Sequence, residues 1–287
     1  MASGNVERAR RSGTLPWRQA KPVLAPADPG AMESVLATDA GGGEQSVSQP
    51  AQRAEDLVYE AWEATGARRA ALARQALALW PDCADAYVLL AQETASLGEA
   101  RELLERGVAV GERAVGRKAF AQDVGHFWLV FETRPYMRAR AALAAVLWRL
   151  GRHDEAVEHQ RELLRLNTND NQGLRYRQTL WLLTLESYDE LDELFVAYHD
   201  GGAPGLIYTE ALAAFRRRGD EAASRDLLAE ARELNPHIAT YLTGHKTLPK
   251  RRPAYTVFGE ETEAIDYAAG AGELWASVPG ALAWLQS

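Results

Sequence analysis

The feature that most constrains the fold is a pair of glycine-led blocks separated by 68 residues. Gly151 begins Gly-Arg-His-Asp-Glu-Ala-Val, and Gly219 begins Gly-Asp-Glu-Ala-Ala-Ser. Thr168 follows the first glycine by 17 residues, and Pro236 follows the second by the same number. Because 68 is twice 34, the spacing predicts helix-turn-helix units over 137–170, 171–204 and 205–238. Such units stack on their neighbours into an α-solenoid.

The residue pattern within these units is typical of helices. Between about 54 and 238 the chain is rich in Ala, Leu, Glu and Arg, which favour helix. Apolar residues recur every three or four positions, as at Leu143, Val146, Leu147 and Leu150. No stretch in this region alternates with the period of two that a half-buried strand requires. We therefore predict an all-α fold.

Two further units precede the regular ones. Trp80-Pro81-Asp82 closes a shortened unit that turns at Gly66, and the next unit turns at Gly98. Gly98 and Gly151 are 53 residues apart, which is 34 plus 19, so we expect an insertion at about 107–136. Five units exceed the three that a stable stack usually needs.

The two ends of the chain differ from this body. Residues 1–50 hold five of the 12 prolines and have no sustained apolar period, which predicts a disordered tail. The α-solenoid then covers 51–238. Residues 239–287 begin with a loop around Lys250-Arg251-Arg252, followed by a helix from Glu260 to Ala269 and a short helix after Pro279. We expect this segment to cap the last unit.

Two longer phrases carry a family resemblance. Residues 125–140 and 166–176 resemble bacterial tetratricopeptide-repeat (TPR) proteins and the suppression-of-tumorigenicity-seven family. The resemblance covers about 120–287, although Thr168 stands where a proline is more usual. It implies a TPR-like α-solenoid that works as an interaction protein, and it supplies no catalytic residues.

The sequence lacks the patterns of common catalytic and metal sites. It has no His-Glu-x-x-His motif, no glycine-rich phosphate loop and no nucleophile elbow. The single cysteine, Cys83, rules out an intrachain disulfide framework and is expected to be structural. The asparagines in 167–171 imitate a calcium loop, but Gln172 and Gln178 stand where Gly and Glu are needed, so we predict a turn between units. We expect no enzyme activity, no cofactor and no metal.

Candidate binding residues come from the first helix of each unit, since those helices line the concave side of such a stack. In the three regular units, the positions of these first helices that are expected to point into the concave side carry five arginines and no acid. The chain as a whole has a net charge of −8. Arginine binds carboxylates with two parallel hydrogen bonds, and aromatic side chains dominate binding energy. We predict a basic groove for an acidic or carboxylate-bearing peptide. Its residues are Arg138, Trp148, Arg149, Arg175, Thr179, Arg216 and Arg217. A rotation of each helix by one position would instead place the arginines on a solvated rim.

The predicted function is a cytoplasmic scaffold or adaptor that binds a protein or peptide partner. In the alternative, the groove is filled by the protein itself. A second copy in the groove would make the chain a self-assembly module, and its own acidic segment 28–44 in the groove would make it an autoinhibited one. The acidic balance argues against nucleic acid as the partner. The sequence contains no run of 18 apolar residues, so it predicts no membrane-spanning helix.

Two local runs have competing interpretations. The aromatic run Phe127-Trp128-Leu129-Val130-Phe131 is predicted to be a buried helix within the insertion, with an exposed docking patch as the alternative. The acidic residues between 186 and 193 are expected to form a solvated outer face.

Overall fold

The computed structural model describes residues 48–198 and 203–287. Nearly all of the tail predicted at 1–50, including the acidic segment 28–44, lies outside the described residues. Within them, helices make up all the regular secondary structure, and the only strand-like pairing is an isolated bridge between His126 and Asn167. The all-α prediction is confirmed. The chain divides into two compact units, 1–172 and 173–287, which are described separately.

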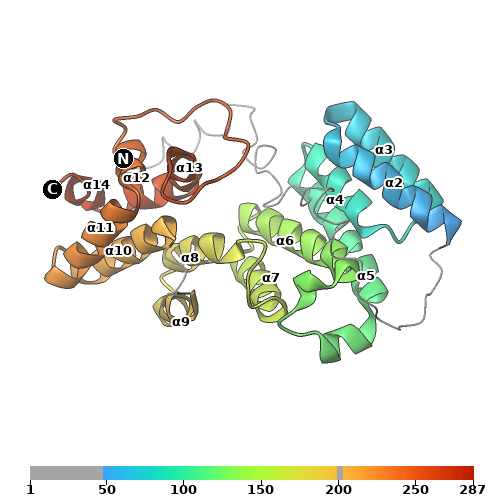
Figure 1. Cartoon of the computed structure of the whole chain (residues 1–287), viewed down its shortest axis with the longest axis horizontal. Coiled ribbons are helices and arrows are strands. Elements are labelled where there is room, and N and C mark those ends of the chain that lie inside the picture. Colours follow the sequence, from blue (N-terminus) through green and yellow to red (C-terminus); the bar gives the residue numbers. More distant parts are fainter. Residues whose placement is uncertain (1–47, 199–202) are drawn as a thin grey trace, which may run out of the picture. The chain divides into compact units, whose positions relative to one another are not determined.

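The first unit contains three helix pairs (Figure 1). They are α2 (Gln49–Glu63) with α3 (Gly66–Leu79), α4 (Ala84–Glu93) with α5 (Leu97–Gln122), and α6 (Arg134–Arg149) with α7 (His153–Leu166). Each helix packs against the next one in the chain, and the first helices of neighbouring pairs also touch, α2 against α4 and α4 against α6. This is the stacking of helix pairs that the sequence predicts.

The predicted insertion at about 107–136 covers the second half of α5 and two short 3-10 helices, η3 (Phe127–Leu129) and η4 (Phe131–Thr133). Gly116 interrupts α5 with φ 71° and ψ 160°. At Gly111 the helix passes so close to α6 that an added Cβ would lie 2.9 Å from the Cα of Tyr136. The half-buried ring of Phe120 then packs against the buried rings of Phe127 and Tyr136.

The second unit contains two helix pairs and a longer C-terminal part. Its elements are α8 (Leu174–Thr184), α9 (Tyr188–Tyr198), α10 (Pro204–Arg218), α11 (Ala222–Leu234), α12 (Pro236–Leu242), α13 (Glu261–Ser277) and α14 (Ala281–Trp284). Helix α10 packs against α8, α11, α13 and α14, so it is buried on nearly every side. The helix predicted from Glu260 continues to Ser277 instead of ending near Ala269.

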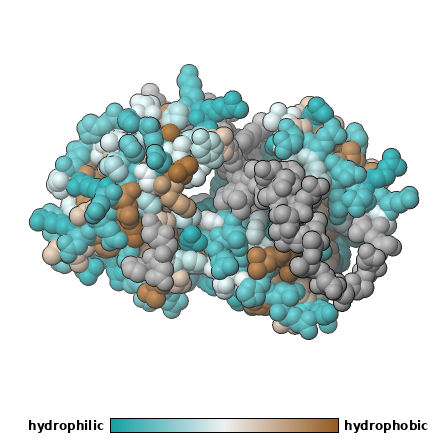
Figure 2. Space-filling model, in the orientation of Figure 1, coloured by the Kyte–Doolittle hydropathy of each residue, from teal (hydrophilic) through white to brown (hydrophobic). Residues whose placement is uncertain are grey.

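The turns predicted at Gly151 and Gly219 form, whereas the chain reverses at 94–96 and Gly98 lies in the first turn of α5. Gly151 and Gly219 both have positive φ, 78° and 76°, directly after α6 and α10, a conformation that glycine adopts without steric cost. Residues 167–173 form turns between α7 and α8, as predicted for the asparagine-rich run. On the face shown in Figure 2, hydrophilic residues predominate and hydrophobic ones form small separate patches. No helix in the described ranges is long and apolar enough to cross a membrane.

Candidate functional site

The seven residues predicted to line a groove divide between the two units. Three lie on α6 in the first unit: Arg138, Trp148 and Arg149. Four lie in the second unit: Arg175 and Thr179 on α8, and Arg216 and Arg217 on α10.

Arg138 is held by a carboxylate from the neighbouring helix pair. Its Nε donates to Oδ1 of Asp85 over 2.8 Å, and its Nη2 donates to Oδ2 over 2.5 Å. Asp85 is only 7% exposed. Burial alone would lower the pKa of Arg138, but the charge and hydrogen bonds of Asp85 outweigh burial and raise it. This two-point ion pair ties α4 to α6.

Trp148 and Arg149 lie on the last turn of α6. The indole of Trp148 stacks on the ring of His153 at the start of α7, with centroids 4.1 Å apart. Arg149 is half-buried, and burial lowers its pKa. These two side chains lie three turns along the helix from Arg138.

On α8, Arg175 is held against aromatic rings. Its guanidinium lies 4.8 Å from the ring centre of Tyr176 and 5.1 Å from that of Tyr198. Thr179 is 1% exposed, and its hydroxyl donates to the carbonyl of Tyr176 within the same helix. The structure thus places Thr179 in the interior of the unit.

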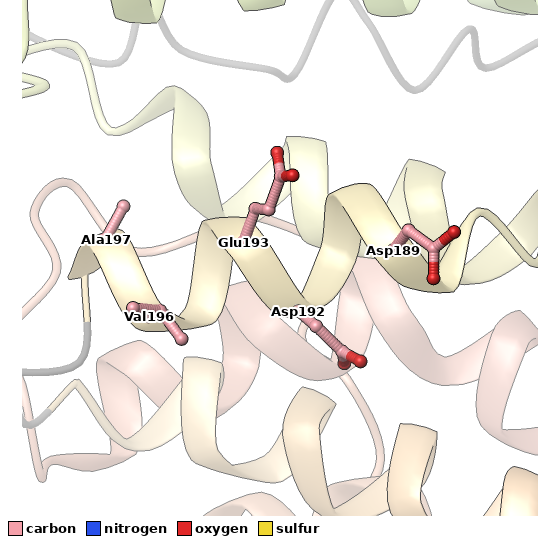
Figure 3. A pocket seen from close by; sticks show the side chains of 5 residues that line it. All are labelled: Asp189, Asp192, Glu193, Val196 and Ala197. Carbon is pink, nitrogen blue, oxygen red and sulfur yellow. The ribbon is translucent and has the colours of Figure 1, made fainter.

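The two arginines of α10 contact the α8–α9 hairpin. Arg216 donates to the carbonyl of Leu183 over 2.8 Å and forms an ion pair with Glu186 at 2.5 Å. Arg217 pairs with Asp192 of α9 at 2.8 Å. In Figure 3, Asp192 lies on one side of α9 while Glu193 lies on the other. The acidic run therefore supplies Glu186 and Asp192 as partners for arginines, besides presenting charge to solvent.

Helix α13 lies along α10 at positions that the repeat pattern assigned to the concave side. The hydroxyls of Thr209 and Tyr267 are 3.0 Å apart, and Glu263 accepts a hydrogen bond from the amide of Gly205 over 3.2 Å. A Cβ at Gly205 would lie 2.9 Å from the ring of Tyr267. A segment of the chain itself covers this part of α10.

Arg134, which is not among the seven predicted residues, lies in an environment suited to binding a ligand. Arg134 begins α6, and its Nε donates to the carbonyl of Trp128 over 2.8 Å. Its guanidinium lies 4.0 Å from the ring centre of Phe131 and 5.3 Å from that of Trp128. Within residues 48–198 and 203–287, its two terminal amino groups have no hydrogen-bond or ion-pair partner. Burial and the nearby positive charge of Arg138 lower the pKa of Arg134.

The run that contacts this guanidinium also exposes large apolar side chains. Leu129 is 59% exposed and Phe131 is 53% exposed, whereas Phe127 is fully buried. The prediction that this run forms a buried helix is wrong: it forms two 3-10 turns, in which Phe127 is buried, Leu129 and Phe131 are exposed, and the other two residues are half-buried. The aromatic run 127–131 was the feature of the sequence that could have revealed this site. Its alternative interpretation, an exposed docking patch, agrees with the exposure of Leu129 and Phe131.

Helix α2 contributes the opposite edge of this surface. Tyr59 is 64% exposed and lies near Arg134 and Arg138. The pKa of Glu55 is raised, first by burial and then by the negative charges of Asp56, Asp85 and Glu132. The surface therefore has a cationic side at Arg134 and an anionic side at Glu55. We call it the inner surface of the first unit, defined by Glu55, Tyr59, Leu129, Phe131, Arg134 and Arg138.

Cys83 lies next to this surface but inside the core, where it is 3% exposed. Burial raises the pKa of its thiol to about 11. No group of three or more His, Cys, Asp or Glu side chains in the described parts of the chain is placed to hold a metal ion.

Comparison with known proteins decides the family. The family model described as ST7 protein matches residues 46–287. The chain is a member of the ST7 family. This ST7-family chain is 30% identical over 262 residues to the suppressor of tumorigenicity 7 protein-like of Bos taurus, covering 81% of this chain and 46% of that protein. It is 31% identical over 235 residues to the suppressor of tumorigenicity 7 protein of Mus musculus, covering 71% of this chain and 39% of that protein.

The chain thus spans less than half the length of these ST7 relatives. Among solved structures it is similar to YrrB, described as a TPR protein with an unusual peptide-binding site. That similarity has a TM-score of 0.46 and 19% sequence identity, and it covers 64% of this chain and 84% of YrrB.

Proposed function

We propose that this ST7-family chain is a non-catalytic protein-interaction scaffold that binds a carboxylate-bearing peptide segment on the inner surface of its first unit. The observation that carries the proposal is Arg134. Its ring contacts and its hydrogen bond to Trp128 fix the plane of the guanidinium, while its terminal amino groups remain available to a ligand. Guanidinium groups bind carboxylates through two parallel hydrogen bonds, and prior orientation lowers the entropy lost on binding.

The charges around Arg134 favour an anion. Arg138 lies near it, and both groups are partly desolvated, so a ligand carboxylate would relieve the unfavourable burial of the Arg134 charge. Asp85 neutralises Arg138 through two hydrogen bonds, so we assign Arg138 to holding the surface together and Arg134 to contacting the ligand.

The apolar groups supply the remaining recognition. Exposed aromatic and aliphatic side chains clustered on one face mark interaction sites more often than scattered ones do, and aromatic residues are enriched among those that dominate binding energy. Phe131 lies against the guanidinium, Tyr59 lies near it, and Leu129 is exposed in the same run as Phe131. Glu55 adds a negative charge on the α2 side. We infer a ligand with an apolar side chain beside its carboxylate and a basic group toward α2. Along α6, Trp148 and Arg149 would extend the contact.

Selection of peptides from a random phage-displayed library against the full chain tests this function. We expect the selected peptides to share an acidic residue or free C-terminus next to an apolar residue. Arg134→Lys keeps the charge but loses the planar fork, so it should weaken their binding about tenfold, as measured by fluorescence anisotropy. Phe131→Ala should weaken binding by a similar or larger factor.

A matched control separates this site from general charge effects. Arg218 is an exposed arginine at the end of α10, so Arg218→Lys should leave affinity unchanged. The proposal is wrong if the selected peptides share no carboxylate, or if they bind the Arg134→Lys chain as tightly as the wild type.

A further inference from the structure

The segment from Thr243 to Glu260, between α12 and α13, has an unusual surface. Figure 1 shows it as a long arch that leaves the helices of the second unit and returns to α13. It contains no helix longer than a turn. We call it the α12–α13 arch.

Large apolar side chains on the arch are exposed to solvent, although the ring of Phe258 also lies 6.1 Å from that of Tyr176 on α8. Tyr255 is 71% exposed, Phe258 59%, Val257 44% and Leu248 39%. Four such residues within eleven positions form a concentration that a surface loop with no binding role would not need.

The arch also carries mainly positive charge, and its one acid, Glu260, lies at its end. Lys246, Lys250, Arg251 and Arg252 lie between 243 and 259, and no Asp or Glu does. Lys246 is paired with Glu261 at 2.7 Å, and Arg252 lies 4.0 Å from Asp266. Lys250 and Arg251 are exposed and have no ion pair within the described parts of the chain. A local positive patch thus stands out on a chain of net charge −8.

Hydrogen bonds at both ends hold the arch in place. The amide of Lys246 donates to the carbonyl of Thr240 over 2.9 Å. At the other end, the amide of Val257 donates to the hydroxyl of Thr262 over 3.0 Å, and the amide of Gly259 donates to Glu263 over 2.8 Å. Because the ends are tied to α12 and α13, the apolar side chains cannot easily turn inward. The structure presents them at the surface.

We propose that the α12–α13 arch docks on a lipid surface that contains anionic headgroups. Lys and Arg near such a surface are attracted to its negative charge, and Tyr and Phe settle at the boundary between headgroups and acyl chains. The arch combines the two groups in one protruding segment. A bilayer needs no groove to cradle it, so it suits a protruding segment of this kind.

This surface belongs to the second unit, and its role does not depend on the peptide site proposed for the first unit. The arch and Arg134 therefore fail or succeed in separate experiments.

Co-sedimentation of the full chain with vesicles tests the proposal. Vesicles of phosphatidylcholine alone are compared with vesicles that also contain about 30% phosphatidylserine. We expect binding only to the anionic vesicles, and a marked loss at about 1 M salt, where the Debye length is near 3 Å. Lys250→Gln together with Arg251→Gln should weaken binding about 25-fold, since each cation near the surface contributes about a factor of five. Tyr255→Ala with Phe258→Ala should weaken it about tenfold or more.

The control removes the same charge elsewhere. Arg74 and Arg218 are exposed and lie on α3 and α10, so their double change to Gln should bind vesicles as the wild type does. The altered residues of the arch are exposed, and an unchanged circular dichroism spectrum checks that their variants fold.

Three outcomes would overturn the proposal. The full chain could fail to bind anionic vesicles, it could bind uncharged vesicles equally well, or the arch variants could bind no worse than the Arg74 and Arg218 control. If poly-glutamate or an RNA oligomer binds through Lys250 and Arg251 while vesicles do not, the arch recognises another polyanion and the lipid assignment is wrong.

Discussion

The ion pair between Asp85 and Arg138 offers a quantitative test of how the first unit is held together. Arg138→Met removes the charge and keeps much of the side-chain volume, leaving the Asp85 carboxylate 7% exposed and without its partner. Breaking a buried pair in this way costs about 3–5 kcal/mol. Because the Arg138 side chain is 28% exposed, water can reach the vacated site, and we expect the lower value, about 3 kcal/mol.

The reverse change should cost less. Asp85→Ala leaves Arg138 able to extend toward solvent, which limits the loss to about 2 kcal/mol. The double variant has no unpaired charge, so its loss should be smaller than the sum of the single losses by about 2 kcal/mol. Amide hydrogen exchange of α4 and α6 in the full chain measures these free energies of opening within the first unit.

An exposed pair in the same unit provides the control. Arg113 and Asp82 lie 2.7 Å apart, but their side chains are 62% and 55% exposed. The same double-variant cycle there should give a coupling below about 1 kcal/mol. If the Asp85 and Arg138 losses are additive within about 0.5 kcal/mol, burial does not strengthen this pair and the reasoning fails.

Three further predictions concern individual side chains. Burial lowers the pKa of His159 from 6.5. The folded state therefore keeps its full stability above about pH 6.5 and loses stability as the pH falls below that value, because the unfolded chain takes up the proton more readily. His159→Gln should reduce this loss in thermal melts. Gly205→Ala should destabilise the second unit by about 1–3 kcal/mol in urea denaturation through contact with Tyr267, whereas Gly272→Ala, which meets no atom within 4 Å, should be neutral or stabilising. Trp284→Ala should cost about 3–5 kcal/mol in the same assay, because the indole is 5% exposed and stacked within the unit.

Local patterns were sufficient to predict the helix pairs. Gly151 and Gly219 mark turns because each takes a positive φ directly after a helix, and this requirement is visible in the residue type alone. The repeat spacing then places the helices between them. Such information is local, so no long-range contact has to be known.

Contacts between helices were not predictable in the same way. Asp85 and Arg138 are separated by 53 residues, so the repeat pattern could count Arg138 as an open cation without revealing its partner. The same holds for Arg217, whose partner Asp192 lies on another helix. Charge counted along one face of a helix does not include acids that reach it from neighbouring helices.

Two further differences have local causes. Helix α13 continues through Gly270 and Gly272, residues that weaken helices, because Leu274 and Trp275 are buried and hold its second half in place. The run from Phe127 to Phe131 forms 3-10 turns that bury only Phe127, and apolar composition alone cannot distinguish this from a buried helix.

The burial of Cys83 has a practical consequence for spectroscopy. It is the only cysteine of the chain, and with a pKa of about 11 almost none of its thiol is ionised at neutral pH. Since the thiolate is the reactive form, maleimide reagents should leave the folded native chain unlabelled. A cysteine introduced at an exposed position can then carry a single fluorophore or spin label without replacement of Cys83, and slow labelling of Cys83 itself would report opening of the helix pairs around it.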